Sequence, residues 1–375
     1  MISSPGSSVR CAVPPESAKT RSVAFLFLGE SLLIPHLLPI VDALAELAPA
    51  LPIDLWVRDE ATEAVLAASG THGKAMVRIR RAPGFDRRLR KLALLLRMVP
   101  RLWSAPVVVC AEQTSLWIPR LFPFHWRFIK TAHGVGSMSA RDDPRRRAAW
   151  RLLVPSELER ETYLRRGIWP ERVLVTGYVK ASFTGGAFRP SFPTPRPIVL
   201  YTPHWQRHRS SWWDWGRQIV AMLIRQQRFN VILAPHQRLV ERDPTVRDVL
   251  AEAAAAPHVH ADLDSFAMVD GSYTAAADIY LGDTSSQVVE FLARPRPCVF
   301  LNSQQLDWRA TDDHGFWECG EVVDDLARVE GALDEAAHAH ERYIQVQRAF
   351  AAKALGDTSS EAPRRAARII LDALR

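Results

Sequence analysis

Short apolar runs alternate with helical patterns along this chain, and no other feature of the sequence restricts the fold as strongly. The runs have the length and polarity of buried strands, and helical patterns lie between most of them. Strands separated by helices pair in parallel, because the chain crosses over the sheet before each new strand. The pattern therefore predicts an α/β fold with parallel sheets covered on both faces. The expected strands are residues 23–28, 53–57, 76–79, 106–111, 127–131, 152–155, 173–176, 198–202, 229–233, 258–260, 279–281 and 298–301.

The alternation is interrupted over residues 180–197, and this break predicts a domain boundary. The segment carries Gly185, Gly186, Pro190, Pro193, Pro195 and Pro197. We therefore expect a disordered lead-in over 1–20, a first domain over 21–180, a linker over 181–197 and a second domain over 198–375. Two doubly wound, Rossmann-like domains would leave a cleft between the carboxyl ends of their sheets, where ligands bind in such folds.

Bulk composition excludes several classes of protein. The chain has 375 residues, a hydrophobic content of 47% and a net charge of +7, which indicate a globular protein with an anionic partner. Its four cysteines, Cys11, Cys110, Cys298 and Cys319, have neither disulfide nor metal spacing, which indicates a reducing, cytosolic setting. No apolar run of about 20 residues is present, so no membrane span is expected. No nucleic-acid-binding motif is found, and no Gly-x-Gly-x-x-Gly of a dinucleotide dehydrogenase follows the first strand.

Basic and acidic side chains recur where expected strands end. Because the carboxyl ends of parallel strands share one edge of a sheet, such residues would face one cleft. A histidine there can act as a general base on a hydroxyl, and arginine and histidine can neutralise a diphosphate. Any one of these histidines can instead be structural. The residues are His133, Gly134, His204, Arg207, Arg209, His236 and Asp283.

The stretch from Asp278 to Asn302 combines a strand, a turn and a helix start. Thr284, Ser285 and Ser286 are good N-cap residues ahead of apolar positions spaced for one buried helix face. Hydroxyls and free N–H groups at a helix start attract anions, phosphate above all. An ordinary capped helix is the alternative interpretation. With the strand-end residues, the stretch indicates transfer from a nucleotide-diphosphate donor to an alcohol.

A series of short motifs occurs in a fixed order from about residue 130 to about residue 325. They are His133-Gly134, Thr176-Gly177-Tyr178, Leu200 to Trp205, Leu233 to His236, Asp283 to Ser286, Glu290 to Leu292, Arg296-Pro297 and Gly315 to Trp317. In this order they resemble the CDP-glycerol glycerophosphotransferase family of teichoic-acid-type polymer synthesis. That family has the two-domain GT-B glycosyltransferase architecture, so the resemblance implies a GT-B-like fold here. The last helix is a candidate to cross back to the first domain.

The resemblance implies a role for the motif residues. His133, with Gly134 beside it on the acceptor side, would be the catalytic base, and His236 would contact the donor phosphates during catalysis. The residues expected to bind the donor phosphates and nucleotide are His204, Arg207, Arg209, Asp283, Thr284, Ser285, Ser286 and Glu290. No cofactor is expected beyond the CDP-activated donor, which is a substrate, and no metal ligand is identified.

The chain departs from the family's pattern, and the departures leave the donor open. Gln206 stands where the family has an arginine, and Lys180 takes the place of the arginine after the Gly-Tyr turn. Thr284 replaces a tyrosine, and Gln237 replaces a proline. Another cytidine-activated polyol or a nucleotide sugar would also fit this pattern.

The resulting functional hypothesis is a transferase that moves a polyol-phosphate unit from a CDP-activated donor to a hydroxyl of a surface polysaccharide or a lipid-linked acceptor. One alternative is a nucleotide-sugar glycosyltransferase or a non-hydrolysing sugar-nucleotide epimerase on the same architecture. The other is an inactive scaffold of a membrane-bound synthesis complex.

Residues 87–103 predict a basic amphipathic helix. The segment contains no acidic residue, and its apolar stripe is formed by Leu89, Leu92, Leu96, Val99 and Trp103. Its basic residues are Arg87, Arg88, Arg90, Lys91, Arg97 and Arg101. Such a helix can lie on an anionic membrane surface, or it can pack on the core as an ordinary surface helix. The resemblance favours the membrane and implies a peripheral protein on its cytoplasmic face.

Four tryptophans lie close together after the strand at 198–202. They are Trp205, Trp212, Trp213 and Trp215. Core filling is the simplest interpretation, and a stacking platform for a cytosine or a sugar is the alternative.

Overall fold

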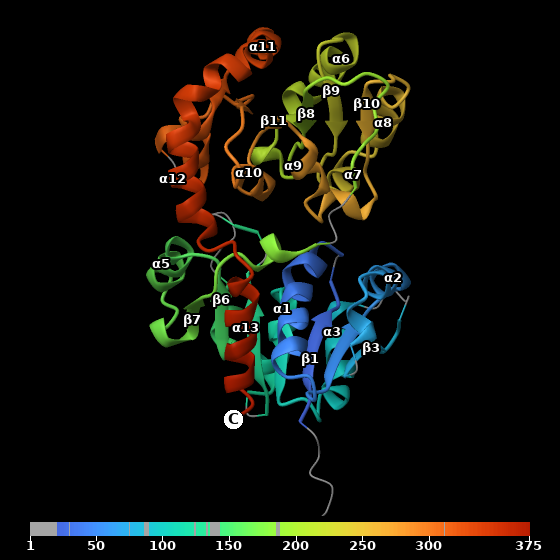
Figure 1. Cartoon of the computed structure of the whole chain (residues 1–375), viewed down its shortest axis with the longest axis vertical. Coiled ribbons are helices and arrows are strands. Elements are labelled where there is room, and N and C mark those ends of the chain that lie inside the picture. Colours follow the sequence, from blue (N-terminus) through green and yellow to red (C-terminus); the bar gives the residue numbers. More distant parts are fainter. Residues whose placement is uncertain are drawn as a thin grey trace, which may run out of the picture.

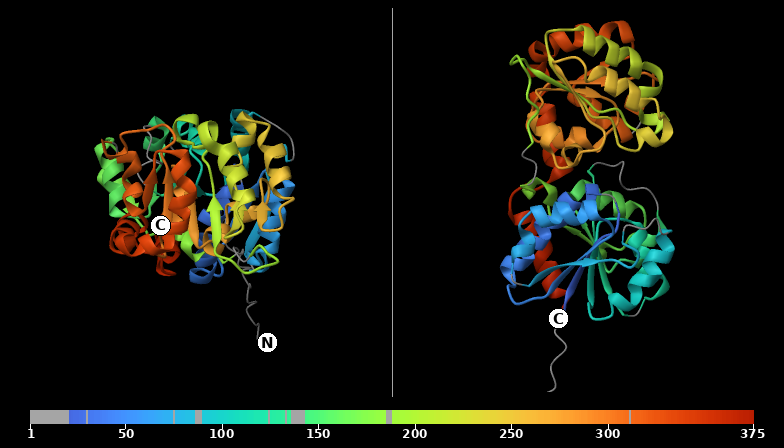
Figure 2. Two further views of the ribbon diagram at one scale, coloured as in Figure 1. Left: turned by 90° about the horizontal axis from the view of Figure 1, so that it is seen from above. Right: turned by 90° about the vertical axis from the view of Figure 1, so that its right-hand side faces the viewer.

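Two parallel sheets, each with helices on both faces, form the molecule and lie one above the other along its longest axis (Figure 1). The structure is a computed structural model that describes residues 21–29, 31–74, 76–85, 90–123, 125–132, 134–135, 143–184, 188–310 and 312–375, without the side chains at positions 72, 286, 312 and 313. The second domain sits above the first in the right-hand view of Figure 2.

The first sheet has the strand order β3-β2-β1-β4-β5-β6-β7, and all neighbouring strands are parallel. Alternate residues of β1 enter opposite apolar layers, because side chains along a strand point to opposite faces. Phe25 and Phe27 pack in one layer, and Ala24 and Leu26 in the other. The strands are β1 (Val23–Phe27), β2 (Ile53–Val57), β3 (Val77–Arg81), β4 (Val107–Cys110), β5 (Arg127–Thr131), β6 (Arg151–Val154) and β7 (Val173–Val175). The helices are α1 (Ile34–Leu47), α2 (Glu60–Ala68), α3 (Lys91–Met98), α4 (Trp117–Leu121) and α5 (Glu157–Arg165).

The second sheet has the order β10-β9-β8-β11-β12-β13 and is also parallel throughout. It has the same two-layer core, with Val199 and Tyr201 of β8 on one side and Leu200 on the other. The strands are β8 (Ile198–Tyr201), β9 (Asn230–Leu233), β10 (Val259–Ala261), β11 (Ile279–Gly282), β12 (Cys298–Leu301) and β13 (Glu321–Val323). The helices are α6 (Arg217–Arg225), α7 (Leu239–Arg242), α8 (Val246–Ala253), α9 (Ser272–Ala276), α10 (Ser286–Phe291), α11 (Val329–Ala339) and α12 (Ile344–Leu355).

The last helix, α13 (Glu361–Asp372), packs against α1 beside the first sheet (Figure 1). Ala362, Ala366, Ala367 and Ile370 are fully buried in one apolar layer of that sheet. The chain reaches this position through Gly356, which follows α12 and has a φ of +63°. A Cβ atom at Gly356 would lie 2.3 Å from the Pro155 carbonyl oxygen, so the crossing requires a glycine there.

The two parallel-sheet, Rossmann-like domains confirm the fold class predicted from the sequence, and each expected strand is present. β13 was missed because its three residues give too short an apolar pattern. The helix predicted over 87–103 was wrong in its extent: the α-helix spans Lys91–Met98, and Pro100 lies in the 3-10 turn that follows. Residues 86–89 lie outside the described residues.

Candidate active site

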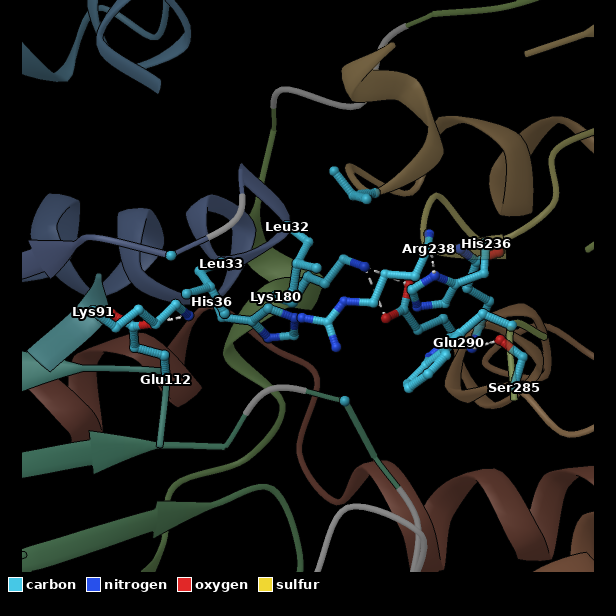
Figure 3. Close-up of a pocket in the computed structure, with 15 residues that line it drawn as sticks. Leu32, Leu33, His36, Lys91, Glu112, Lys180, His236, Arg238, Ser285 and Glu290 are labelled. Carbon is cyan, nitrogen blue, oxygen red and sulfur yellow. Dashed lines mark hydrogen bonds and ion pairs between the residues drawn. The ribbon is translucent and has the colours of Figure 1, made fainter. Parts of the chain in front are cut away.

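A cavity of about 330 Å³ lies where the carboxyl ends of the two sheets meet (Figure 3). Its walls come from residues that follow strands in both domains. Gly29, Glu112 and Gly134 follow β1, β4 and β5 of the first sheet, whereas Trp205, His236 and Ser285 follow β8, β9 and β11 of the second. Parallel strands therefore bring together residues that are far apart in the sequence.

His236 lies in the second-domain wall with its ring orientation fixed by local backbone contacts. The backbone N–H of His236 donates to the Pro203 carbonyl oxygen at 3.1 Å, and the Nδ1 atom of its ring accepts a hydrogen bond from the backbone N–H of Arg238 at 3.1 Å. Because Nδ1 accepts, the proton of the neutral ring is assigned to Nε2, which makes Nε2 a hydrogen-bond donor. The same arrangement occurs at His204, whose Nδ1 accepts from the Gln206 N–H at 3.1 Å.

Arg238 and Trp205 add positive charge and an aromatic face to this wall. The guanidinium of Arg238 lies 5.6 Å from the Trp205 ring centroid, and that of Arg242 lies 5.7 Å from it. In these cation–π contacts the two arginine side chains already pack against the Trp205 ring, so part of the ring is covered by the protein's own side chains. Of the other three tryptophans, Trp212 is buried in the core, and Trp213 and Trp215 pack against it.

Ser285 is the N-cap of α10. Its hydroxyl accepts a hydrogen bond from the Gln287 N–H at 3.2 Å, and Gln287 also lines the cavity. The side-chain amide of Gln287 donates to the Met268 carbonyl oxygen at 3.1 Å. The predicted capped helix is therefore present, and its first turn borders the cavity.

Glu290, on the same short helix, is paired with a lysine that comes from the first domain's side of the cavity. The Lys180 ammonium donates to both carboxylate oxygens at 2.8 and 2.7 Å, and the Tyr178 hydroxyl donates to the same carboxylate. Lys180 and Glu290 side chains are only 10% and 12% exposed. The 3-10 turn that carries Lys180 packs on α1 and α13, so this nearly buried ion pair joins the two domains.

Asp283 is buried and bound by its own chain. Its carboxylate accepts hydrogen bonds from the His204 N–H at 3.0 Å, the Ser211 N–H at 2.7 Å and the Ser211 hydroxyl at 2.9 Å. Burial raises the pKa of Asp283 to about 7, and these hydrogen bonds oppose that rise. The carboxylate thus fixes the loop that follows β8.

The structure brings some of the predicted site residues together and separates others. Gly134, His236, Ser285 and Glu290 line the cavity. Arg209, Asp283 and Thr284 line a separate, much smaller cavity of about 10 Å³. The His204 ring lies 5.6 Å from the His236 ring, and the Arg207 guanidinium lies 5.8 Å from the Trp213 ring. His133 and the Ser286 side chain lie outside the described residues.

Six charged or polar residues of the cavity were not predicted as site residues from the sequence: His36, Lys91, Glu112, Lys180, Arg238 and Gln287. Glu112 could have been found, because it directly follows an expected strand, as the predicted histidines do. Lys180 was visible only as a departure from a family motif. His36 and Lys91 lie on helices, and their positions depend on how α1 and α3 pack against the sheet.

The first-domain end of the cavity is formed around Glu112, which is only 8% exposed. Its carboxylate accepts hydrogen bonds from the Thr114 hydroxyl at 2.8 Å, the Ser115 hydroxyl at 3.0 Å and the Lys91 ammonium at 3.3 Å. Among the described residues, no group of three or more His, Cys, Asp or Glu side chains is placed to hold a metal ion.

No protein-family model and no curated protein matches this sequence, but solved structures do match its fold. The wall teichoic acid polymerase TagF, soaked with CDPG, is 13% identical, with a TM-score of 0.61 over 96% of this chain and 91% of that one. The S. aureus MnaA–UDP structure is 13% identical, with a TM-score of 0.64 over 94% of this chain and 97% of that one. UDP-GlcNAc 2-epimerase from Neisseria meningitidis, bound to UDP-GlcNAc, is 11% identical, with a TM-score of 0.58 over 94% and 98%. At these identities the likeness shows the fold, two Rossmann-like domains in the GT-B arrangement.

Proposed function

We propose that this chain transfers a polyol-phosphate unit from a CDP-activated donor to a hydroxyl of a surface-polysaccharide or lipid-linked acceptor. The observation that carries the proposal is the convergence of Gly134, His236, Ser285 and Glu290 on one cavity. These residues belong to separate motifs of the CDP-glycerol glycerophosphotransferase pattern and span more than a hundred positions of sequence. The shared fold with a teichoic acid polymerase supports the same assignment.

In the proposed reaction the acceptor oxygen attacks the phosphorus that carries the polyol. The new P–O bond forms as the bond from that phosphorus to the bridging oxygen breaks, and CMP leaves with the electron pair. The Nε2–H of His236 and the guanidinium of Arg238 would stabilise the charge that develops on the leaving phosphate. The hydroxyl proton would pass to His133, which remains our candidate base on sequence grounds.

A nucleotide-sugar glycosyltransferase or epimerase is the second candidate. Structures solved with UDP and with UDP-GlcNAc share this fold. The buried carboxylate of Glu112 would also suit an enzyme that moves protons on a sugar. An inactive scaffold is the third candidate. It differs from the two candidate enzymes in binding a donor without turning it over.

A donor panel tests the proposal. Purified protein would be incubated with a synthetic glycerol phosphate dimer as hydroxyl acceptor and with CDP-glycerol, CDP-ribitol or UDP-GlcNAc, and CMP, UDP and isomerised sugar would be measured by mass spectrometry. We expect CMP from a CDP-polyol, and we expect His236→Asn to lower that turnover by about 10²–10³-fold, as loss of a donor to a developing charge does. His338→Asn, on the exposed face of α11, is the matched control. Turnover of UDP-GlcNAc alone would favour the second candidate, and binding of a donor without turnover would favour the scaffold.

We also propose that the α3 side of the first domain rests on an anionic membrane surface. The exposed stripe of α3 and its 3-10 extension continues onto α4, which packs against α3. Its large apolar side chains are Leu92, Leu96, Trp103, Leu121 and Phe122, each 42–63% exposed. The core contacts of α3 use other residues, Leu94, Leu95 and Met98. Arg97, Arg101 and Arg120 supply positive charge beside the stripe, as membrane-surface helices require.

None of the helices in the described ranges has the length and apolar character needed to cross a membrane. The attachment that we propose is peripheral, and we place it on the cytoplasmic face on the basis of the resemblance and the cysteine spacing.

A further inference from the structure

At the first-domain end of the cavity, the carboxylate of Glu112 has no role in the proposed donor chemistry. Figure 3 shows Lys91 and Glu112 at one end and His236, Arg238 and Ser285 at the other. The donor phosphates are assigned to the His236 end. A substrate that reaches the Glu112 end must therefore come from the acceptor.

The surroundings of Glu112 prepare its carboxylate to accept hydrogen bonds. The Thr114 and Ser115 hydroxyls and the Lys91 ammonium all donate to it. The chain also leaves room for it at Gly29, where a Cβ atom would lie 2.9 Å from Glu112 Oε2. A buried carboxylate held in this way is a fixed acceptor rather than a mobile surface charge.

The chemistry of Glu112 selects the kind of ligand group it can bind. An ionised carboxylate accepts hydrogen bonds only, so the ligand must donate, as a hydroxyl or an ammonium does. The Lys91 ammonium, 3.3 Å from Glu112 Oε2, repels a second cation. A hydroxyl of a polyol or a sugar is the group that fits both neighbours.

Lys91 connects this end of the cavity to the proposed membrane face. It is the first residue of α3, and Leu92, the next residue, begins the exposed apolar stripe. A lipid-linked acceptor held at that face would reach the Glu112 end of the cavity first.

We propose that Glu112 binds the acceptor hydroxyl and turns it toward the donor phosphorus, and that Lys91 is a positioning residue that fixes the Glu112 carboxylate. This inference rests on the proposed function, since it uses the assignment of the donor to the opposite end. It gives the transferase a second substrate contact, one that acts on the acceptor and leaves donor binding unchanged.

The test separates acceptor kinetics from donor binding in the full-length protein. A synthetic glycerol phosphate dimer would serve as soluble acceptor, and CDP-glycerol as donor. We expect Glu112→Gln to lower kcat/KM for the acceptor by about tenfold to hundredfold, the effect of losing a hydrogen bond to a charged group. CDP-glycerol affinity, measured by calorimetry, should stay within about twofold of the unmodified protein. Glu161→Gln, an exposed glutamate of α5, controls for loss of one charge.

Lys91 variants test the positioning role and guard against misfolding of Glu112→Gln. Lys91→Met should lower the same acceptor parameter by about threefold to tenfold, and Lys91→Arg should restore it, because the cation is retained. Lys353→Met on α12 is the matched control. Unchanged acceptor kinetics in both Glu112→Gln and Lys91→Met, or a loss of donor affinity equal to the loss of activity, would overturn the inference while leaving the transferase proposal intact. Absence of turnover with every donor of the panel would reject both.

Discussion

The Asp283 carboxyl group is the clearest case of a single residue whose environment changes its chemistry. Burial raises its pKa from 3.8 to about 7. Between these values the native protein keeps the proton that the unfolded chain releases, so the unfolded state binds fewer protons. The contribution of Asp283 to the free energy of unfolding is therefore present below about pH 4 and is lost as the pH rises through 7.

Urea unfolding of the unmodified protein and of Asp283→Asn at several pH values measures this contribution. We expect the difference in free energy of unfolding between the two proteins to shrink as the pH rises from 4 to 7, because the variant has no proton to release. Asp248→Asn, at an exposed position of α8, is the control. The difference in free energy of unfolding between it and the unmodified protein should not shrink in this way, because position 248 is not buried. A difference that stays constant over this range would mean that the hydrogen bonds from Ser211 and His204 keep Asp283 ionised.

At the residue scale, the sequence predicted a site residue well where it directly follows a buried strand. His236 and Ser285 line the cavity because strand ends in a parallel sheet share one edge. The same rule placed Asp283 at that edge but could not show that its carboxylate is used by the Ser211 loop. Lys180 could not be predicted, because its partner Glu290 is 110 positions away and their contact depends on how the domains pack.

At the scale of elements, α3 has a core face and an exposed apolar face. We expect the protein to sediment with vesicles that contain phosphatidylglycerol at low salt and to be released by about 0.5 M salt, since exposed charges are screened over a few ångström at high ionic strength. Arg97→Glu with Arg101→Glu should weaken binding by about tenfold to a thousandfold, at roughly 1 kcal/mol for each charge near the surface. Lys91 is left unchanged in this variant because it lines the cavity.

The control for this experiment is Arg348→Glu with Lys353→Glu, which makes the same charge change on the exposed side of α12 in the second domain. It should sediment as the unmodified protein does. If the unmodified protein stays in the supernatant at low salt, the stripe of α3 is an ordinary exposed surface. Release of both double variants alike would show attachment by net charge and not by α3.

Elements differ in how much of them could be predicted. Most of the strands were predicted because they are short runs buried on both faces, which leaves a strong local pattern. The ends of the helices were predicted less accurately. The apolar periodicity of residues 239–255 predicts one helix, but the structure breaks this segment into α7 and α8 around Pro244. Residues 328–353 also predict one helix, and the turn at His340–Tyr343 divides it. Periodicity continues across such breaks, so it does not reveal them.

At the scale of the whole molecule, the crossing at Gly356 joins the second domain to the last helix of the first. We expect Gly356→Ala to destabilise the protein by several kcal/mol. The backbone at Gly356, with φ +63° and ψ −137°, is a conformation that costs about 1–3 kcal/mol for a residue with a Cβ atom, and the Pro155 carbonyl, 2.3 Å from that atom, must also move. Gly70→Ala is the matched control, because Gly70 has a φ of +73° with no atom within 4 Å of the added Cβ.

Thermal unfolding followed by circular dichroism would compare these two variants. Gly70→Ala should cost only about 1–2 kcal/mol, the penalty for the left-handed conformation alone. Equal losses in the two variants would mean that the crossing adapts without strain. A much larger loss for Gly356→Ala would show that the path of the chain between α12 and α13 is fixed.

The return of α13 to the first domain also has a consequence for biosynthesis. The apolar layer that contains Val23 and Phe25 of the first strand is completed by Ala366 and Ile370, which leave the ribosome only after the whole second domain. The second domain, from β8 to α12, is complete in the nascent chain before the first one is. A ribosome stalled after α12 would therefore carry a second domain able to fold and a first domain with one face of its core uncovered, open to chaperones until α13 is synthesised.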